Sequence, residues 1–370
     1  MIRVVLCTDG VFPEAMGGMQ RHSRLLAEHL ARTGAVDLTV IHPHAPGLFD
    51  PVLGIHEVCI PNIDTDKFYL RELWRYSGRV AEELDRLEAD VILSQGFSVW
   101  KDAQRFSDRL IVHPHGLEMY QGLTARERVM GIPFRIVLRR IVRRARVVVS
   151  LGGRLTTILD GITNGSRCTV VTLPNAVDVP TDPTVYVPSS PLRFLFVGRF
   201  AFNKGLDVLM TVARRLAAEG RSSEYHFDLA GAGPLLASYQ AMGLPDNVSL
   251  LGRVEDDRLF QLYSGCDAFL LPTRFEGMPT VVLEAMGRSR PVMVSDVGAT
   301  AELVDASNGY LLRKGDAEDL YARIREFGSR SPEQRAEMGR SSWQKARERF
   351  DWTVVTPGFV RLFKDIAGNK

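Results

Sequence analysis

The chain of 370 residues is poor in cysteine and has no long apolar run. Its four cysteines lie far apart and form no C-x-x-C pair, so buried thiols are favoured over disulfides or a cysteine metal site. No apolar stretch is long enough to cross a bilayer, and no signal peptide precedes the apolar run Ile2 to Cys7. We therefore expect a cytoplasmic protein. Peripheral contact with the inner membrane face is a further hypothesis.

The chain also lacks a large excess of charge of either sign. The 46 basic and 44 acidic residues give a formal net charge of +2, which argues against a general nucleic-acid binder. Hydrophobic residues make up 45% of the chain, enough for globular cores. Because 370 residues exceed what one core usually supports, two domains are expected.

The start of the chain lacks the dinucleotide-binding G-x-G-x-x-G fingerprint. Gly17 and Gly18 instead stand where a helix from about residue 19 to 32 begins, after the first apolar run. Their backbone amides could face a phosphate, although glycine pairs are more often surface turns. Nicotinamide binding is disfavoured by the spacing.

Short apolar runs alternate with segments of helical periodicity in both halves of the chain. This alternation predicts an α/β fold with doubly wound parallel sheets. A proline-rich linker at 181–191 separates a first domain at 1–180 from a second at 192–351, and a last helix lies within 352–370. Asp64-Thr65-Asp66 matches a short acidic metal motif, but we interpret it as a turn that caps the next helix.

The stretch 268–286 is the most informative one. A buried strand at 268–271 leads to a turn, and Pro279 suits the first position of a helix. The backbone amides of residues 280–282 are then expected to lack intrahelical partners and to face a ligand. Gly277 permits close backbone approach, and Glu276 and Glu284 flank the turn. Amides that bind anions beside two acceptors suit a sugar nucleotide.

These residues resemble the retaining glycosyltransferases of family four. The resemblance rests on Glu276 and Glu284, with seven residues between them, within Pro-Thr-Arg-Phe-Glu-Gly-Met-Pro and Leu-Glu-Ala-Met. It implies the GT-B fold, in which two Rossmann-like domains face each other across a cleft and the C-terminal helix crosses back to the first domain. It also implies transfer of a sugar from a nucleotide-diphosphate sugar, UDP first and GDP next, to a saccharide or lipid-linked acceptor. Bacterial cell-surface polysaccharide or glycolipid synthesis is the expected setting, with no metal and no other cofactor.

The resemblance assigns roles to individual positions. Arg199 and Lys204 follow a strand and precede a helix, where an arginine fork and a lysine point charge suit a diphosphate. His115 would contact the donor sugar; a metal interpretation of His113-Pro114-His115 lacks further ligands nearby. The implied catalytic set is His115, Arg199, Lys204 and Glu276. The implied donor-binding set is Gly17, Gly18, Gly198, Arg199, Lys204, Gly231, Gly233, Arg253, Val254, Glu276, Gly277, Met278, Pro279, Thr280 and Glu284.

In the implied mechanism the cations Arg199 and Lys204 and the backbone amides of the donor-binding set stabilise the leaving diphosphate. Glu284 accepts hydrogen bonds from the ribose, Glu276 orients a sugar hydroxyl, and the departing phosphate oxygen takes the acceptor proton. One departure from the family pattern stands at Ser289-Arg290, where a glycine is usual.

A basic helix is expected over residues 134–148. Its arginines could bind anionic lipid or an acidic acceptor, or it could be an ordinary surface helix whose apolar side packs inside. The arginines concerned are Arg135, Arg139, Arg140, Arg143 and Arg144. Three other functions stay open for the chain as a whole: a sugar-nucleotide epimerase, a phosphorylase, for which no clear pyridoxal-phosphate lysine is present, and a non-catalytic sugar-nucleotide binding protein.

Overall fold

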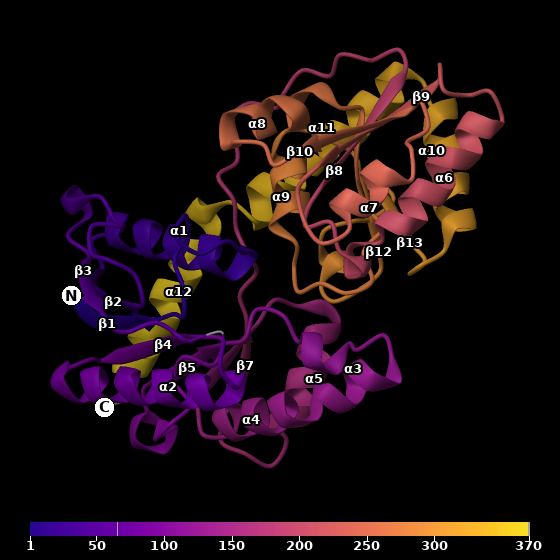
Figure 1. Cartoon of the computed structure of the whole chain (residues 1–370). Coiled ribbons are helices and arrows are strands. Elements are labelled where there is room, and N and C mark those ends of the chain that lie inside the picture. Colours follow the sequence, from indigo (N-terminus) through magenta and orange to yellow (C-terminus); the bar gives the residue numbers. More distant parts are fainter. Residues whose placement is uncertain (65, 369–370) are drawn as a thin grey trace. The chain divides into compact units, whose positions relative to one another are not determined.

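The computed structural model describes residues 1–64 and 66–368, and its contacts divide the chain into two compact units (Figure 1). The first comprises Met1–Asn175 together with the chain from Trp352 onward, and the second is Ala176–Asp351. Residues 176–191, which we expected to end the first domain and form the linker, are grouped with the second unit. The acidic motif at 64–66 includes Thr65, which lies outside the described residues.

The first unit is built on a seven-stranded sheet of order β3-β2-β1-β4-β5-β6-β7, whose neighbouring strands run parallel. The strands are β1 (Ile2–Cys7), β2 (Val36–His42), β3 (His56–Cys59), β4 (Val91–Gln95), β5 (Leu110–His113), β6 (Val147–Ser150) and β7 (Thr169–Thr172). Its helices are α1 (Gly18–Arg32), α2 (Tyr69–Arg86), α3 (Ala125–Met130), α4 (Ile132–Val142), α5 (Gly153–Thr163) and α12 (Trp352–Ala367). Every residue of β4 is buried because helices cover both faces of the sheet.

The C-terminal helix α12 packs on α1 and on strands β1 and β4. Figure 1 shows α1 and α12 on one side of the sheet and α2 on the other. The helix turns one apolar stripe inward, including Trp352, Phe359 and Phe363, at spacings of about two turns and one turn. The last helix therefore belongs to the first unit, as the resemblance implied.

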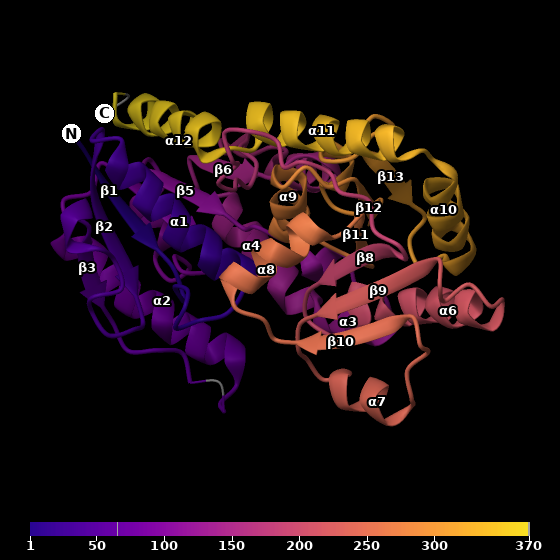
Figure 2. The ribbon, with the colours of Figure 1, turned by 90° about the horizontal axis from the view of Figure 1, so that it is seen from above.

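The second unit contains a six-stranded sheet of order β10-β9-β8-β11-β12-β13. Its strands are β8 (Leu192–Val197), β9 (Tyr225–Ala230), β10 (Val248–Gly252), β11 (Ala268–Leu271), β12 (Val292–Ser295) and β13 (Gly309–Leu312). Its helices are α6 (Leu206–Ala218), α7 (Leu236–Ala241), α8 (Asp256–Gly265), α9 (Thr280–Gly287), α10 (Ala317–Ser329) and α11 (Pro332–Arg349). Figure 2 shows β8, β9 and β10 side by side and pointing the same way. The strand order reverses between β8 and β11, which is the position where open α/β sheets bind ligands.

The proline-rich segment before β8 is fastened to the second unit. The backbone N–H of Thr184 donates to Ser289 Oγ at 2.9 Å, and Tyr186 Oη donates to the Asp267 carboxylate at 2.5 Å. Ser289 has a φ of 58°, in the left-handed region that favours glycine. Ser289, at one of the two positions where the resemblance leads us to expect a glycine, thus bears backbone strain and holds this segment with its hydroxyl.

The expected basic helix is shorter than predicted. Helix α4 ends at Val142, residues 143–146 form a turn, and Val147 begins β6. The run Val147 to Val149 is β-branched and pairs with β7, and Val147 and Val148 also pair with β5, so the sheet ends the helix early. Within residues 1–64 and 66–368, no helix has both the length and the apolar composition needed to span a bilayer.

Candidate functional site

Two loops at the carboxyl edge of the second sheet are bound to each other. One follows β8 and the other follows β11, the two strands at the point of reversal. The backbone N–H of Arg274 donates to the carbonyl of Asn203 at 2.7 Å, and Thr273 Oγ1 donates to the same carbonyl at 2.9 Å. The Arg274 guanidinium also makes two bonds to Asp207, at 2.7 and 2.6 Å. The loop that carries Lys204 is therefore held against the loop that carries Glu276.

These contacts bring Lys204 and Glu276 together. Lys204 Nζ lies 2.5 Å from Glu276 Oε1, and the two side chains are 22% and 11% exposed. Arg199, on the same loop as Lys204, is exposed, and its side chain has no ion-pair or hydrogen-bond partner among the residues that the structure describes. The loop after β8 thus offers a paired lysine and an exposed arginine at the sheet edge.

Gly205 makes this loop packing possible. It has a φ of 71°, and a Cβ atom there would lie 1.8 Å from the Pro272 carbonyl oxygen. Gly298 acts similarly on the far side of the second loop, where a Cβ would lie 2.2 Å from the Glu276 carbonyl oxygen. Only glycine allows these backbones to approach so closely.

The amino end of α9 points into the same region. Pro279 stands just before the first helical residue, and no side chain of the described residues caps the helix. We expected three unpaired amides, but the Val282 N–H donates to the Pro279 carbonyl at 3.2 Å. The Thr280 and Val281 amides, at half-buried positions, keep the partly positive helix start that suits an anion. Gly277 and Met278 precede this helix start; Gly277 is half-buried, and Met278 is buried.

Glu284 lies just over one turn inside α9 and is half-buried. Its Oε2 accepts a hydrogen bond of 2.9 Å from the hydroxyl of Tyr263, a fully buried residue of α8. Tyr263 was missed by the sequence analysis, because nothing in the pattern of α8 shows which apolar-face residue reaches α9. The tyrosine fixes the orientation of one carboxylate oxygen.

The remaining predicted positions of this unit gather at the same edge. A Cβ on Gly231 would lie 1.9 Å from the Gly198 carbonyl oxygen, and one on Gly233 would lie 2.6 Å from the Phe200 carbonyl oxygen. These glycines let the loops after β8 and β9 touch, which is a packing role. Arg253 and Val254 follow β10 directly, and Arg253 is exposed.

In the first unit, Gly17 and Gly18 stand at the start of α1, as predicted. Helix α1 begins at Gly18 without a side-chain cap, and both glycines are exposed. Gly17 is extended, and its carbonyl accepts from the Arg21 N–H at 3.0 Å. Like the start of α9, this helix start leaves amides for a ligand or water.

His115 belongs to a cluster of three histidines at the carboxyl edge of the first sheet. His113 ends β5, His115 follows it with a φ of 59°, and His22 comes from α1. One nitrogen from each of the three rings lies within 4.8 Å of the others. The expectation that the His-x-His pair has no third histidine nearby is therefore wrong. Sequence reasoning missed His22 because the contact depends on how α1 packs against the sheet.

Burial controls the charge of this cluster. Desolvation lowers the pKa of His22 to about 3 and holds the pKa values of His113 and His115 well below the usual 6.5, with neighbouring histidines adding to both. Gln95, at the end of β4, bonds to both: its Oε1 lies 3.2 Å from His113 Nδ1 and contacts His115 Nε2. The three rings are thus neutral at pH 7.

The predicted basic residues divide into two groups. Arg135 donates to the Met119 carbonyl at 2.6 Å, Arg143 donates to three carbonyls at the end of α5, and Arg144 donates to Gln104 at 3.1 Å. Arg139 and Arg140 are exposed, with no side-chain partner in the described part of the chain. The apolar side of α4 is buried, as the surface-helix alternative required.

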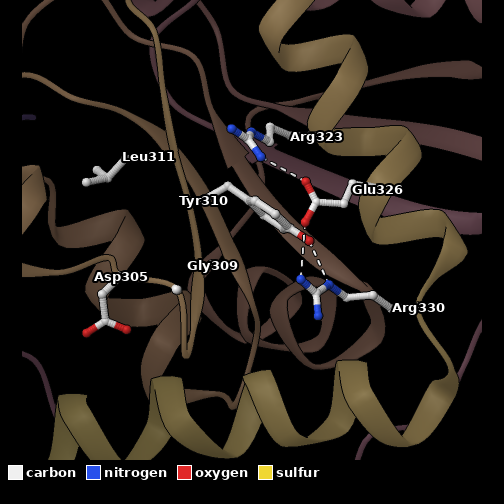
Figure 3. A pocket seen from close by; sticks show the side chains of 8 residues that line it. Asp305, Gly309, Tyr310, Leu311, Arg323, Glu326 and Arg330 are labelled. Atoms are coloured by element: carbon white, nitrogen blue, oxygen red, sulfur yellow. Dashed lines mark hydrogen bonds and ion pairs between the residues drawn. The ribbon is translucent and has the colours of Figure 1, made fainter.

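A cavity of about 270 Å³ lies elsewhere in the second unit, beside α10 and the amino end of β13 (Figure 3). Arg323 and Arg330 both bond to Glu326, and Arg330 also donates to the Tyr310 hydroxyl at 2.7 Å. These charges satisfy one another, and the amino end of a strand is not the edge that carries the predicted residues. The cavity is therefore not assigned to the candidate site.

Comparison with known proteins gives matches to both halves of the chain. A family model described as Glycosyltransferase Family 4 matches residues 16–180, and one described as Glycosyl transferases group 1 matches residues 191–329. The chain therefore belongs to the family-four, group 1 glycosyltransferases.

Individual relatives agree with this assignment. The putative colanic acid biosynthesis glycosyltransferase WcaL of Salmonella typhimurium is 32% identical over 161 residues, which is 40% of this chain and 38% of that protein. The chain spans about half the length, or less, of the first curated relatives it matches.

Two solved structures share the fold. They are the sucrose-phosphate synthase of Thermosynechococcus elongatus (TM-score 0.84, 18% identity, all of both chains) and Anabaena HepE in complex with UDP and glucose (TM-score 0.73, 18% identity, 99% of this chain and 100% of that one). The GT-B fold that the resemblance implied is confirmed.

Proposed function

We propose that the protein transfers a sugar from a nucleotide-diphosphate sugar to a saccharide or lipid-linked acceptor. The observation that carries this proposal is the joining of two loops at the strand-order reversal, which places Lys204 2.5 Å from Glu276. A diphosphate needs cations and amide donors, and a sugar needs carboxylate acceptors. Both kinds of group occur here on rigid loop contacts.

The residues take separate roles in this proposal. Arg199, Lys204 and the amides of Thr280 and Val281 bind the diphosphate and stabilise its added charge as the glycosidic bond breaks. Glu284, held by Tyr263, accepts from the ribose hydroxyls, and backbone groups near Arg253 read the base. Glu276 accepts from a hydroxyl of the transferred sugar.

His115 is the first unit's proposed contribution, together with the amides at Gly17 and Gly18. A neutral imidazole can exchange a hydrogen bond with a sugar hydroxyl without adding charge near an oxocarbenium-like centre. The departing phosphate oxygen takes the acceptor proton on the same face, so transfer retains the anomeric configuration and needs no metal. No side chain is assigned as a nucleophile.

UDP-sugars are the first donors to test, and GDP-sugars the second. The HepE structure contains UDP and glucose, which supports a uridine donor for this chain without naming its sugar. WcaL is named for colanic acid biosynthesis, which supports an acceptor on the way to a cell-surface glycan. Exposed Arg139 and Arg140 are the residues proposed to contact anionic lipid around such an acceptor.

A transfer assay tests the function. Purified protein is given each donor with a bacterial lipid-linked saccharide fraction, and nucleotide diphosphate release is followed with and without the acceptor. Acceptor-dependent release with an unchanged anomeric configuration by NMR is expected. Release of a free, epimerised sugar without acceptor would indicate an epimerase instead. Binding of the donor without any turnover would indicate a sugar-nucleotide binding protein.

A further inference from the structure

The His22–His113–His115 cluster has a feature that the proposed transfer does not use. Both ring nitrogens of His22 and Nε2 of His113 are buried and have no hydrogen-bond partner among the described residues. A buried polar atom without a partner costs about 1–3 kcal/mol, so a folded protein normally satisfies such atoms. Three such atoms in two neighbouring rings of one cluster indicate a missing partner.

The missing partner must suit neutral imidazoles. The three histidines reach the same point from α1, from the end of β5 and from the residue after Pro114, and one nitrogen of each lies within 4.8 Å of the others. Tetrahedral zinc with nitrogen ligands at about 2.0–2.1 Å places those nitrogens about 3.4 Å apart, so the cluster needs only small movements. His113 Nδ1 and His115 Nε2 are already 2.9 Å apart, and an ion bound by these two nitrogens would take the place of Gln95 Oε1, which now contacts both.

We propose that His22, His113 and His115 together bind one divalent transition-metal ion, for which Zn²⁺ is the probe. Three histidines with an open fourth position are a known zinc arrangement, and imidazole also suits Ni²⁺ and Cu²⁺. Mg²⁺ and Ca²⁺ prefer oxygen ligands and are not expected to bind. His115 is half-buried, so the cluster can be reached by an ion from its side.

Ring orientation sets the movement that binding requires. His115 stands nearly perpendicular to the other two rings, at 86° to His113 and 77° to His22, which lets in-plane lone pairs converge. His22 and His113 are nearly parallel, at 17° with centroids 5.2 Å apart, so the His22 ring must turn. Among the described residues, none makes a hydrogen bond to the His22 ring, which packs against the rings of His113, His115 and Trp352, the last at 5.4 Å.

The proposal goes beyond the transfer reaction and does not depend on it. Metal binding would engage His115, the residue proposed to contact the donor sugar. Zinc and sugar would therefore compete for this histidine, and the ion would act as an inhibitor of a reaction that needs no metal.

Direct zinc binding tests the proposal. Full-length protein without a polyhistidine tag is titrated with Zn²⁺ against a chromogenic chelator, and Co²⁺ is used to detect a tetrahedral site by its visible absorption. We expect one equivalent of zinc per chain and an increase in melting temperature that Mg²⁺ does not produce. Wild-type protein that takes up no equivalent of zinc would overturn the proposal.

Two variants and a control identify the ligands. His22→Phe keeps a ring against Trp352 but removes both nitrogens, and should weaken zinc binding by about 100-fold or more. His44→Ala, from the second His-Pro-His sequence of the chain, should leave binding unchanged, because His44 is outside the cluster. Equal zinc affinity in wild type and His22→Phe would assign the ion to other residues. If His22→Phe does not fold, His115→Ala, at a half-buried position, gives the same comparison.

Discussion

Lys204 Nζ and Glu276 Oε1 lie 2.5 Å apart, so a cation expected to bind diphosphate and a carboxylate expected to bind sugar neutralise each other. Both side chains are mostly buried, which makes an unpaired charge at either position costly. A bound donor would have to break this pair. Its phosphate would become the partner of Lys204, and a hydroxyl of its sugar would become the partner of Glu276. The pair therefore keeps two groups that are proposed to bind the donor ordered before it arrives.

Tyr263→Phe is predicted to weaken donor binding without unfolding the protein. The hydroxyl donates to Glu284 at 2.9 Å and is the only atom removed. Loss of one such bond costs about 0.5–1.5 kcal/mol, or about 2- to 12-fold in the donor KM, with little change in kcat. The effect should be absent for a 2′,3′-dideoxy nucleotide, which has no ribose hydroxyl for Glu284. Tyr239→Phe, at a buried tyrosine of α7, is the matched control; equal effects of both changes would refute the positioning role.

Gly205→Ala is predicted to destabilise the second unit more than Gly220→Ala. The two glycines have nearly the same φ, 71° and 74°, so alanine bears the same backbone strain at both. Only at 205 does the new Cβ meet another atom, the Pro272 oxygen at 1.8 Å, while nothing lies within 4 Å at 220. Overpacking adds about 1–3 kcal/mol, measured by denaturant unfolding. Equal unfolding midpoints would show that the two loops are not packed as described.

Stability is predicted to fall as the pH drops below about 6.5, because an unfolded histidine then takes up protons that the buried rings do not. The pKa of folded His22 is lowered by burial to about 3. The stability that this lowered pKa gives the folded protein is therefore complete above pH 6.5 and decreases down to about pH 3. Each such histidine contributes a slope of up to about 1.4 kcal/mol per pH unit. Unfolding of His22→Phe, with chelator present, should depend less steeply on pH than wild type. The exposed His56→Ala should match wild type, and an unchanged slope in His22→Phe would contradict the account.

Anionic vesicles are predicted to bind the protein through Arg139 and Arg140. At about 1 kcal/mol for each arginine near the surface, replacing both by alanine should weaken vesicle binding about 30-fold, and salt should weaken it in wild type. Arg143 is left intact because it holds the end of α5. Arg32→Ala with Arg86→Ala, at exposed arginines of α1 and α2, is the control for net charge. If the variant with alanine at 139 and 140 floats with the vesicles as well as wild type does, α4 is not the contact with the vesicle.

Local patterns in the sequence predicted the strands, the alternation with helices and the loops that end at the carboxyl edge of each sheet. They did so because parallel buried strands and helix starts depend on neighbouring residues. Contacts between distant elements could not be predicted. Tyr263 reaches Glu284 from another helix, and His22 reaches His113 across the layer between α1 and the sheet. The length of α4 was overestimated because pairing of β6 with its neighbours competes with helix propensity.

Donor binding to wild-type protein and to Lys204→Met tests the central claim most directly. UDP-, GDP-, ADP- and TDP-sugars and the free nucleotides are compared by calorimetry and by the shift in melting temperature. One nucleotide class should bind wild type selectively, and loss of the lysine should weaken it by about 1.5–3 kcal/mol, or about 10- to 150-fold. Lys345→Met, which removes a lysine paired with Asp305 away from the sheet edge, should bind like wild type. No binding of any nucleotide, or binding that Lys204→Met leaves unchanged, would contradict the assignment of this site.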